Sequence, residues 1–351
     1  MSESAAAVTL PRTGREVRLV ARPEGLPGPE HFELVEVPLS WPEPGQVLVR
    51  NLYFGISASL RMMMSQGAED VPGVPFPALA PGDVLAQKAL GRVVATGEGS
   101  SLRPGDLVSH YLGWREYAAV DEAGCTPLGR GELPDPAAYL GHGHTAYAAL
   151  TRGVRIRPGD CVFVTAASGA IGSMAGQIAR LLGAGRVVGS TGSRAKAERL
   201  VSELGYDAAV LRGDAEPLAA QLAKAAPDGV DVVLDNVGGE QLAAAVEVAN
   251  EGAWLLVLGT LSGQLAPQGT GRRAPVELDT VQILLKKLTL RGYSADDDPD
   301  AEQEWHERSA AWLRDGRITF PSVRIHGIEH APEAVLGAMA GQHFGTVVVE
   351  L

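Results

Sequence analysis

The alternation of hydrophobic and polar positions changes character near the middle of the chain. Between residues 15 and 120, short β-rich runs are separated by turn residues such as Pro44-Gly45 and Pro104-Gly105-Asp106. This half is predicted to be a compact antiparallel barrel or sandwich. After about Leu140, apolar strands alternate with helical patterns, as in a parallel sheet that is covered on both faces. The pattern therefore predicts an α/β protein with a second, β-rich domain.

The second half repeats one strand-turn-helix unit. Its first strand, 161–165, leads into apolar residues at helical spacing that run from Ile171 to Leu182 and stop at Gly183. Ser193 can cap the next helix, which ends before Gly205. Six such strands suit a doubly wound Rossmann sheet. The predicted strands are 161–165, 186–190, 208–211, 230–235, 253–258 and 289–293, with further helices near 241–250 and 302–314.

These patterns divide the chain into three parts. We expect residues 1–135 to form the β-rich domain and residues 136–316 to form the Rossmann domain. Residues 317–351 contain two strand-like runs around a short helix, and we expect them to return to the first domain.

Charge and cysteine content narrow the classes of partner. The chain has 30 Lys and Arg against 42 Asp and Glu, a net charge of −12, which argues against a nucleic-acid partner. Cys125 and Cys161 are too few for a four-thiolate zinc site or a disulfide framework, and they indicate a reducing compartment. No apolar run approaches the roughly 20 residues that span a bilayer, and the start lacks a signal-peptide pattern. We expect a cytoplasmic protein without a membrane partner.

A turn of small residues follows the first predicted strand of the second half. The stretch 166–172, AASGAIG, would let a backbone approach a pyrophosphate at the N-terminus of the next helix. The alternative is a tight strand-to-helix connection that needs small residues only for packing. Because a strand precedes the turn and a helix follows it, the context favours dinucleotide binding.

The residues after the second strand indicate which dinucleotide binds. NAD-selective sites place an Asp or Glu about 20 residues after the turn, where it holds the ribose hydroxyls. This chain has Ser190-Thr191-Gly192-Ser193 there, followed by Arg194, Lys196 and Arg199. Small hydroxyls and cations can bind a ribose phosphate instead. The sequence therefore predicts NADP(H), held by Lys196, although these cations can also be ordinary exposed helix residues.

Long stretches of the sequence resemble one enzyme family. LGHGHTAYAAL, VTAASGAIGSMAGQIARLLGAGRVVGSTGSRAKAERL, ELGYDAAV and VDVVLDNVGGEQL in the second half carry the resemblance, and NLYFGISASLRMMM and PGDLVSHYLGWREYAAV agree in the first. They resemble the zinc-independent medium-chain dehydrogenase/reductases of the leukotriene and prostaglandin reductase, or alkenal double-bond reductase, type. The resemblance covers nearly the whole chain.

The resemblance implies a GroES-like domain beside the Rossmann domain, a homodimer, and NADPH between the two domains. The implied activity is reduction of a carbon-carbon double bond conjugated to a carbonyl. The backbone of 168–171 would hold the pyrophosphate, Asn236, Val237 and Thr145 would lie near the nicotinamide, and 258–260 would pass beneath the cofactor. The predicted cofactor-binding residues are Thr145, Ser168, Gly169, Ala170, Ile171, Gly192, Ser193, Lys196, Arg212, Asn236, Val237, Leu258, Gly259, Thr260 and His343.

Several positions depart from the family pattern. Arg212 stands where the family often has Tyr, and its guanidinium could stack on adenine or pair with the phosphate. His343 and Thr346 replace an Asn and a Lys, which changes the cofactor contact expected there. The Asp-Pro-Tyr-Met-Arg stretch of the family becomes 57–61, SASLR, and Gln264 replaces a second tyrosine. The two phenols that usually face the substrate are therefore lost.

The remaining residues favour conjugate reduction without a metal. The thiolates and Gly-His-Glu stretch of zinc alcohol dehydrogenases are absent, and no carboxylate or thiolate set accompanies His142 and His144. We interpret these histidines as polar cleft residues and predict no metal site. An enone spreads the charge that hydride addition creates onto its oxygen, where hydrogen-bond donors can stabilise it. The candidate donors are Tyr53, Ser57, Ser59, His142, His144 and Gln264.

Among these donors, Tyr53, Ser59 and Gln264 are the predicted catalytic residues, although Tyr53 can equally be a core tyrosine and water can supply the proton. Two other functions remain open: quinone reduction by the same hydride route, and a cofactor-binding redox sensor that does not turn over. The Gly/Pro-rich segment 262–280 contains Arg272-Arg273, which could bind an anionic substrate handle or serve as solubilising charge.

Overall fold

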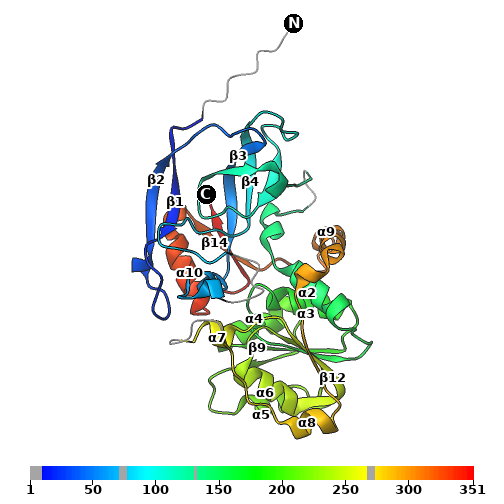
Figure 1. Ribbon diagram of the computed structural model, residues 1–351. Coiled ribbons are helices and arrows are strands. Elements are labelled where there is room, and N and C mark those ends of the chain that lie inside the picture. The colour runs from blue at the N-terminus through cyan, green and yellow to red at the C-terminus, as the bar shows by residue number, and fades with distance from the viewer. Residues whose placement is uncertain (1–9, 71–76, 130–132, 267–272) are drawn as a thin grey trace.

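The chain forms two lobes that are joined by several crossings of the backbone (Figure 1). The computed structural model describes residues 10–70, 77–129, 133–266 and 273–351. In Figure 1 the upper lobe is rich in strands, and the lower lobe is a sheet with helices on both sides. Within the described residues no helix combines the length and apolar character that a bilayer crossing requires.

The lower lobe contains a six-stranded parallel sheet. Its order is β10-β9-β8-β11-β12-β13, the 3-2-1-4-5-6 order of a Rossmann fold, so the predicted fold class is confirmed. The sheet starts from β8 and grows in both directions, which brings the turn after β8 to the point where the strand order reverses. The strands are β8 (Cys161–Val164), β9 (Arg186–Thr191), β10 (Ala208–Leu211), β11 (Val230–Asp235), β12 (Ala249–Val257) and β13 (Thr289–Gly292).

Strand β12 begins four residues earlier than the sequence pattern indicates. Its register on β11 shifts between Val230 and Val232, and Gly252 has a φ of +77°. The first residues of β12 therefore pair across an irregularity, which a search for uninterrupted apolar strand residues does not detect.

Helices cover both faces of the parallel sheet. Ser193 caps α4 as predicted, because its side chain accepts a hydrogen bond from the Lys196 amide, and Gly205 ends the helix at a φ of +70°. Gly176 lets α3 pack closely on Tyr206, because a Cβ at position 176 would lie 2.3 Å from the Tyr206 ring. The helices are α2 (Gly143–Ala148), α3 (Gly172–Leu181), α4 (Arg194–Leu204), α5 (Leu218–Ala225), α6 (Gly239–Val248), α7 (Leu261–Gln264), α8 (Thr280–Leu285) and α9 (Pro299–Arg314).

The upper lobe combines the N-terminal strands with the C-terminal ones. One sheet has the order β14-β15-β3-β4-β5-β7, and β6 also pairs with β3, while β1 and β2 form a separate antiparallel pair. The last strand, β15, is antiparallel to β3. The domain limits at 135 and 316 stay predictions. The elements are β1 (Thr13–Leu19), β2 (Phe32–Pro38), β3 (Gln46–Ile56), α1 (Leu60–Met64), β4 (Ala89–Thr96), β5 (Leu107–His110), β6 (Tyr117–Asp121), β7 (Thr126–Pro127), β14 (Ser322–His326), α10 (Ala331–Met339) and β15 (Thr346–Glu350).

A buried histidine in the upper lobe connects stability to pH. His110 is 2% exposed, its Nε2 donates to Asn51 Oδ1 at 2.9 Å, and its Nδ1 accepts from the Leu112 amide at 3.1 Å. Burial, together with the charge of Arg115, lowers the pKa of His110 to about 4. In the unfolded chain the same group titrates near its ordinary value of about 6.5. Between these two values the unfolded chain binds a proton that the folded chain excludes, so stability falls as the pH falls.

His110→Gln is therefore expected to reduce the loss of stability on acidification. Between about pH 6 and pH 5, the free energy of unfolding of the native protein should fall about 1 kcal/mol more than that of the variant. Urea unfolding at both pH values measures this difference. His326→Gln is the control, because the His326 side chain is 78% exposed. If the free energy of unfolding fell equally with pH in His110→Gln and in the native protein, His110 would not be the group that links stability to pH.

Candidate active site

The turn between β8 and α3 forms a tight backbone cradle. A Cβ at Gly172 would lie 2.5 Å from both the Ala166 carbonyl oxygen and Ala167 Cα, so only glycine fits there. Ala166 itself has a φ of +49°, a conformation that is rare and strained outside glycine. Gly172 therefore lets the first turn of α3 pack directly on the backbone of the preceding turn. The N-terminus of a helix in this position suits an anion. The predicted residues Ser168, Gly169, Ala170 and Ile171 all lie in this turn.

Two contacts fasten the turn to its surroundings. The hydroxyls of Ser168 and Thr191 are 2.9 Å apart, which ties the turn to the end of β9. The amide of Gly345 donates to the Ser168 carbonyl oxygen at 2.8 Å, which ties it to the segment that precedes β15. The turn is thus held by the nucleotide-binding sheet and by the upper lobe together.

Two cations gather at the end of β9 and β10. Lys196 Nζ donates to the carbonyl oxygens of Gly341 and His343, the latter at 2.6 Å. A Cβ at Gly192 would lie 3.1 Å from Arg212 Nε, so the guanidinium lies against the backbone that leads to Ser193. The predicted residues Gly192, Ser193, Lys196, Arg212 and His343 are therefore brought together.

The acid partners of these cations distinguish two groups. Arg194 pairs with Asp214 and Arg199 with Glu203. Among the described residues, Lys196 and Arg212 have no carboxylate partner. Burial and the charges of Arg212 and Arg199 lower the pKa of Lys196. Such an uncompensated pair favours binding of a dianion such as a phosphate monoester.

A buried network lies where β8 and β11 end. Thr165 Oγ1 donates to Asp235 Oδ1 at 2.8 Å and accepts from the Asn236 amide at 2.7 Å. Asn236 Nδ2 donates to the Thr165 carbonyl oxygen at 2.9 Å, while Asn236 Oδ1 is buried and finds no donor among the described residues. A buried acceptor without a partner costs about 1–3 kcal/mol of folding stability. Such an atom is expected where a bound ligand supplies the missing donor.

The segment after β12 packs against this network. The amides of Leu258 and Gly259 both donate to the Asp235 carbonyl oxygen, at 2.7 and 3.2 Å. A Cβ at Gly259 would lie 2.9 Å from the Asn236 carbonyl oxygen. The predicted residues Asn236, Val237, Leu258, Gly259 and Thr260 therefore lie side by side at one edge of the sheet.

On the upper lobe, two hydroxyls lie close together just before α1. Ser57 Oγ and Ser59 Oγ are 2.8 Å apart at the start of α1. Gln87 holds this segment, because its Oε1 accepts from the Ser57 amide at 3.2 Å and from Trp114 Nε1 at 3.1 Å. Sequence reasoning missed Gln87, since its partners are 30 and 27 residues away and no local motif marks the contact.

Gln264 approaches the upper lobe from the lower one. It is the last residue of α7, and the next residue, Leu265, packs against the upper-lobe cluster that contains Leu60 and Met63 of α1. The loop after β12 therefore contacts the core of the upper lobe, and Gln264 lies next to that contact in the sequence.

Tyr53 occupies a different environment. Its ring packs against the cluster of Leu90, Tyr139 and Leu140, and the guanidinium of Arg324 lies 5.4 Å from the ring centroid. This packing favours the core interpretation that the sequence left open, and the catalytic role of Tyr53 stays a prediction outside the site proposed below.

A group of titratable side chains surrounds the two predicted cleft histidines. The rings of His142 and His144 are 6.4 Å apart, and His144 Nε2 lies 3.2 Å from Thr145 Oγ1. Glu302 on α9 lies 3.6 Å from Lys88 of the upper lobe and 3.6 Å from His306. The hydrogen bond from His306 and the charge of Lys88 lower the pKa of Glu302 to about 2. Sequence reasoning missed Lys88 and Glu302, because only the fold brings them together.

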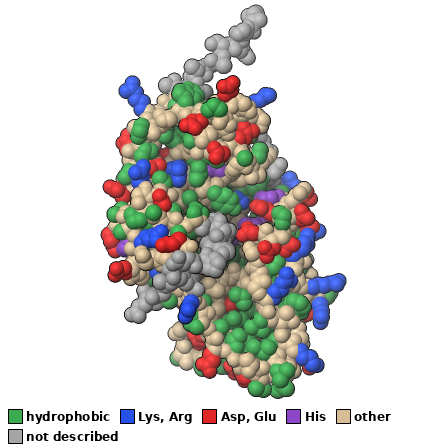
Figure 2. Space-filling model, in the orientation of Figure 1, with side chains coloured by type: hydrophobic (Ala, Val, Ile, Leu, Met, Phe, Trp, Pro, Cys, Tyr) green, Lys and Arg blue, Asp and Glu red, His purple; other side chains and the backbone are tan. Residues whose placement is uncertain are grey.

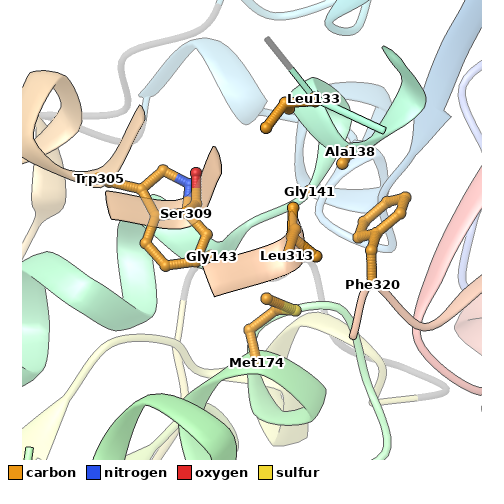
Figure 3. A pocket seen from close by; sticks show the side chains of 9 residues that line it. All are labelled: Leu133, Ala138, Gly141, Gly143, Met174, Trp305, Ser309, Leu313 and Phe320. Carbon is orange, nitrogen blue, oxygen red and sulfur yellow. The ribbon is translucent and has the colours of Figure 1, made fainter. Parts of the chain in front are cut away.

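A small cavity lies behind this group (Figure 3). Its lining is almost entirely apolar and contains none of the predicted binding residues, so it is a packing gap rather than a substrate pocket. Met174, in the first turn of α3, lines it together with the glycines on either side of His142. The remaining lining residues are Leu133, Ala138, Trp305, Ser309, Leu313 and Phe320. The segment 141–143 thus lies beside the N-terminal end of α3.

Of the arginine pair in the segment 262–280, Arg272 lies outside the described residues. The carbonyl oxygen of Arg273 lies 2.4 Å from where a Cβ at Gly263 would be, so residue 273 packs on α7. In the described part of the chain no three His, Cys, Asp or Glu side chains are grouped to hold a metal ion.

Comparison with known proteins agrees with this architecture. Residues 15–128 match a family model described as the N-terminal domain of oxidoreductase, and residues 170–313 match one described as zinc-binding dehydrogenase. A putative NADP-dependent oxidoreductase of Bacillus subtilis is 33% identical over 96% of this chain and 97% of its own. The NADPH-dependent curcumin reductase of Escherichia coli is 33% identical over 95% of each chain. The crystal structure of CurA from Vibrio vulnificus with NADPH superposes with a TM-score of 0.84 at 30% identity, covering 96% of this chain and 98% of that one.

The fold, the cradle and these matches define an oxidoreductase of the dinucleotide-dependent class. The chain belongs to the medium-chain dehydrogenase/reductase family, in its zinc-independent branch. The predictions of the family and of an oxidoreductase are therefore confirmed. The residues present also fit the predicted cofactor. The turn at Gly172 leads into the N-terminus of α3, where a pyrophosphate can bind. Lys196 and Arg212 have no carboxylate partner among the described residues, so they can pair with a phosphate.

Proposed function

We propose that this protein is an NADPH-dependent reductase of carbon-carbon double bonds conjugated to a carbonyl group. The observation that carries the proposal is the kind of side chain that the candidate site offers beside the cofactor-binding residues: the hydroxyls of Ser57 and Ser59, the amide of Gln264 and the imidazoles of His142 and His144. Neutral hydrogen-bond donors of this kind can stabilise an enolate oxygen. The named reductase relatives support the same reaction.

Each part of the site has a role in this proposal. The turn 168–171 binds the pyrophosphate through its amides, and Ser193, Lys196 and Arg212 bind the ribose phosphate. Thr145, Asn236, Val237 and residues 258–260 surround the nicotinamide. When bound, NADPH supplies the hydride. Ser59 and Gln264 orient the carbonyl compound from the two lobes, and water supplies the proton to the α carbon.

Product analysis tests this function. The purified protein is mixed with NADPH and a panel of enones and enals, and separately with a panel of quinones, and the products are identified by mass spectrometry. A saturated carbonyl compound with the original carbonyl intact is the expected result. Quinone reduction alone would favour the quinone reductase, and stoichiometric NADPH binding without oxidation in either panel would favour a redox sensor.

We also propose that the protein is a cytoplasmic homodimer. Both cysteines are free thiols, which suits a reducing compartment. An apolar surface, the α8 patch, consists of Val281, Leu284 and Leu285 on α8, and all three are more than half exposed. Figure 2 shows hydrophobic side chains gathered at the lower end of the molecule, around α8. A second copy can cover this patch beside the edge strand β13.

The double variant Leu284→Asp, Leu285→Asp is expected to be monomeric. These side chains are 74% and 68% exposed, and covering them in a dimer would contribute about 1.5–3 kcal/mol each. Sedimentation velocity at micromolar concentration measures the change. Val201→Asp on α4 is the control, because Val201 is 45% exposed but lies outside the α8 patch. A monomeric native protein would contradict the dimer.

A further inference from the structure

His142 occupies the crossing between the two lobes. The residues before it belong to the upper lobe, since Leu140 packs with Leu90 and Val348 there. The residues after it belong to the lower lobe, since Ala146 and Tyr147 lie in the core of the parallel sheet. The segment 141–143 also lies beside the first turn of α3, as the shared cavity with Met174 shows. The segment that carries His142 therefore lies where the upper lobe meets the N-terminal end of α3.

The two ring nitrogens of His142 differ in their surroundings. Nδ1 is sealed from solvent and has no hydrogen-bond partner among the described residues. The residue as a whole is partly exposed, and Nε2 is not among the buried atoms without a partner in the described residues. A buried N–H without an acceptor is less tolerable than a buried lone pair without a donor. Nδ1 therefore carries the lone pair, and the proton resides on Nε2.

The charges around the ring keep this tautomer neutral. Burial, with the neighbouring His144 and Lys88, lowers the pKa of His142 to about 4. Burial and Lys88 also lower the pKa of His144, while Glu302 opposes them. The charged and titratable groups that face the pair are Lys88 from the upper lobe and Glu302 and His306 from α9. At neutral pH the ring is an uncharged donor with a fixed direction, the form that polarises carbonyls without competing as an acid.

We propose that the Nε2–H of His142 donates a hydrogen bond to the carbonyl oxygen of the substrate and stabilises the enolate. This inference rests on the proposed function. In the step, the β carbon gains a hydride, and the π pair of the double bond shifts to form the enolate with its negative charge on oxygen. The α carbon then takes a proton from water as the carbonyl re-forms. The substrate thereby gains two electrons and two hydrogens, and His142 keeps its proton throughout.

Steady-state kinetics of three variants tests the proposal. His142→Ala is expected to lower kcat about 100-fold, as removal of one donor to a developing oxyanion does. His142→Gln, whose amide nitrogen reaches about as far as Nε2, should recover about tenfold of that loss. The control His306→Gln removes a histidine of the same cluster from α9 and should change kcat less than about threefold. All three should bind NADPH as the native protein does, by fluorescence titration.

The pattern among the variants decides the outcome. Equal kcat values for His142→Ala and the native protein would overturn the proposal, and so would His142→Gln that is no better than His142→Ala. If His142→Ala loses NADPH binding, His142→Gln is compared directly with the native protein, and equal kcat values for these two would overturn the proposal.

A second measurement separates this inference from the proposed function. The ¹⁵N spectrum of histidine-labelled protein, assigned with His142→Gln, should show a neutral Nε2–H ring that does not titrate between about pH 5 and 8. A ring that protonates near its ordinary value would overturn the inference even in an active enone reductase. If the native protein reduces no enone, the proposed function fails whatever the spectrum shows.

Discussion

Gly172→Ala is expected to abolish the binding of both NADPH and NADH. The added Cβ would lie 2.5 Å from the Ala166 carbonyl oxygen and from Ala167 Cα, which are backbone atoms that cannot rotate away. The turn would have to move, and the amides that approach the pyrophosphate would lose their positions. Because several charge-assisted hydrogen bonds are lost together, affinity should fall about 1000-fold or more for each cofactor. Calorimetric titration measures both affinities.

Gly169→Ala is the matched control in the same turn. A Cβ there would meet only the Ala166 carbonyl oxygen, at 3.3 Å, so a shift of a few tenths of an ångström accommodates it. We expect a loss of less than about tenfold for both cofactors. Thermal unfolding of both variants distinguishes lost binding from lost folding. Similar affinities for the two alanine variants would show that the cradle does not hold the pyrophosphate.

The double variant Lys196→Ala, Arg212→Ala is expected to change cofactor preference. Each side chain supplies a cation to the ribose phosphate, and a hydrogen bond to a charged group contributes about 1.5–3 kcal/mol. Together they should weaken NADPH about 1000-fold, while NADH, which lacks that phosphate, changes less than about tenfold. The two single variants should each show a smaller selective loss. Dissociation constants for both cofactors, measured in the same buffer, give the result.

Arg194→Ala on the same helix is the control for the phosphate assignment. The Arg194 side chain is 81% exposed and pairs with Asp214, so its removal should leave the ratio of the two affinities within about threefold of the native value. Equal losses of NADPH and NADH in the double variant would show that the two cations do not bind the phosphate.

Local patterns were sufficient to predict the six strands and the Rossmann class of the nucleotide-binding lobe, but not α5 or α8, and the helix expected near 241–250 ends at Val248. Each strand-turn-helix unit buries its own apolar face, so hydrophobic spacing reports the order of elements directly. The cap at Ser193 and the small residues at 166–172 follow from backbone requirements that act over a few residues. Hydrophobic spacing did not predict the first residue of β12, because the register of β12 on β11 shifts near its start.

The substrate side could not be predicted in the same way. The environments of Gln87, Lys88 and Glu302 depend on contacts between segments that lie far apart in the sequence. Tyr53 illustrates the reverse case, because its motif suggests a donor while its ring packs among Leu90, Tyr139 and Leu140. The burial of His142 Nδ1 without a hydrogen-bond partner is also a property of the folded chain that no local pattern contains.

The residues just before β15 bond to both the cofactor turn and Lys196. Strand β15, which lies between β14 and β3 in the upper sheet, follows these residues directly and anchors them. The two lobes are therefore joined through Gly341, His343 and Gly345 beside the cofactor-binding turn. A truncation that removes β15 would leave these contacts without their anchor, so it should weaken coenzyme retention although no truncated residue belongs to the parallel sheet.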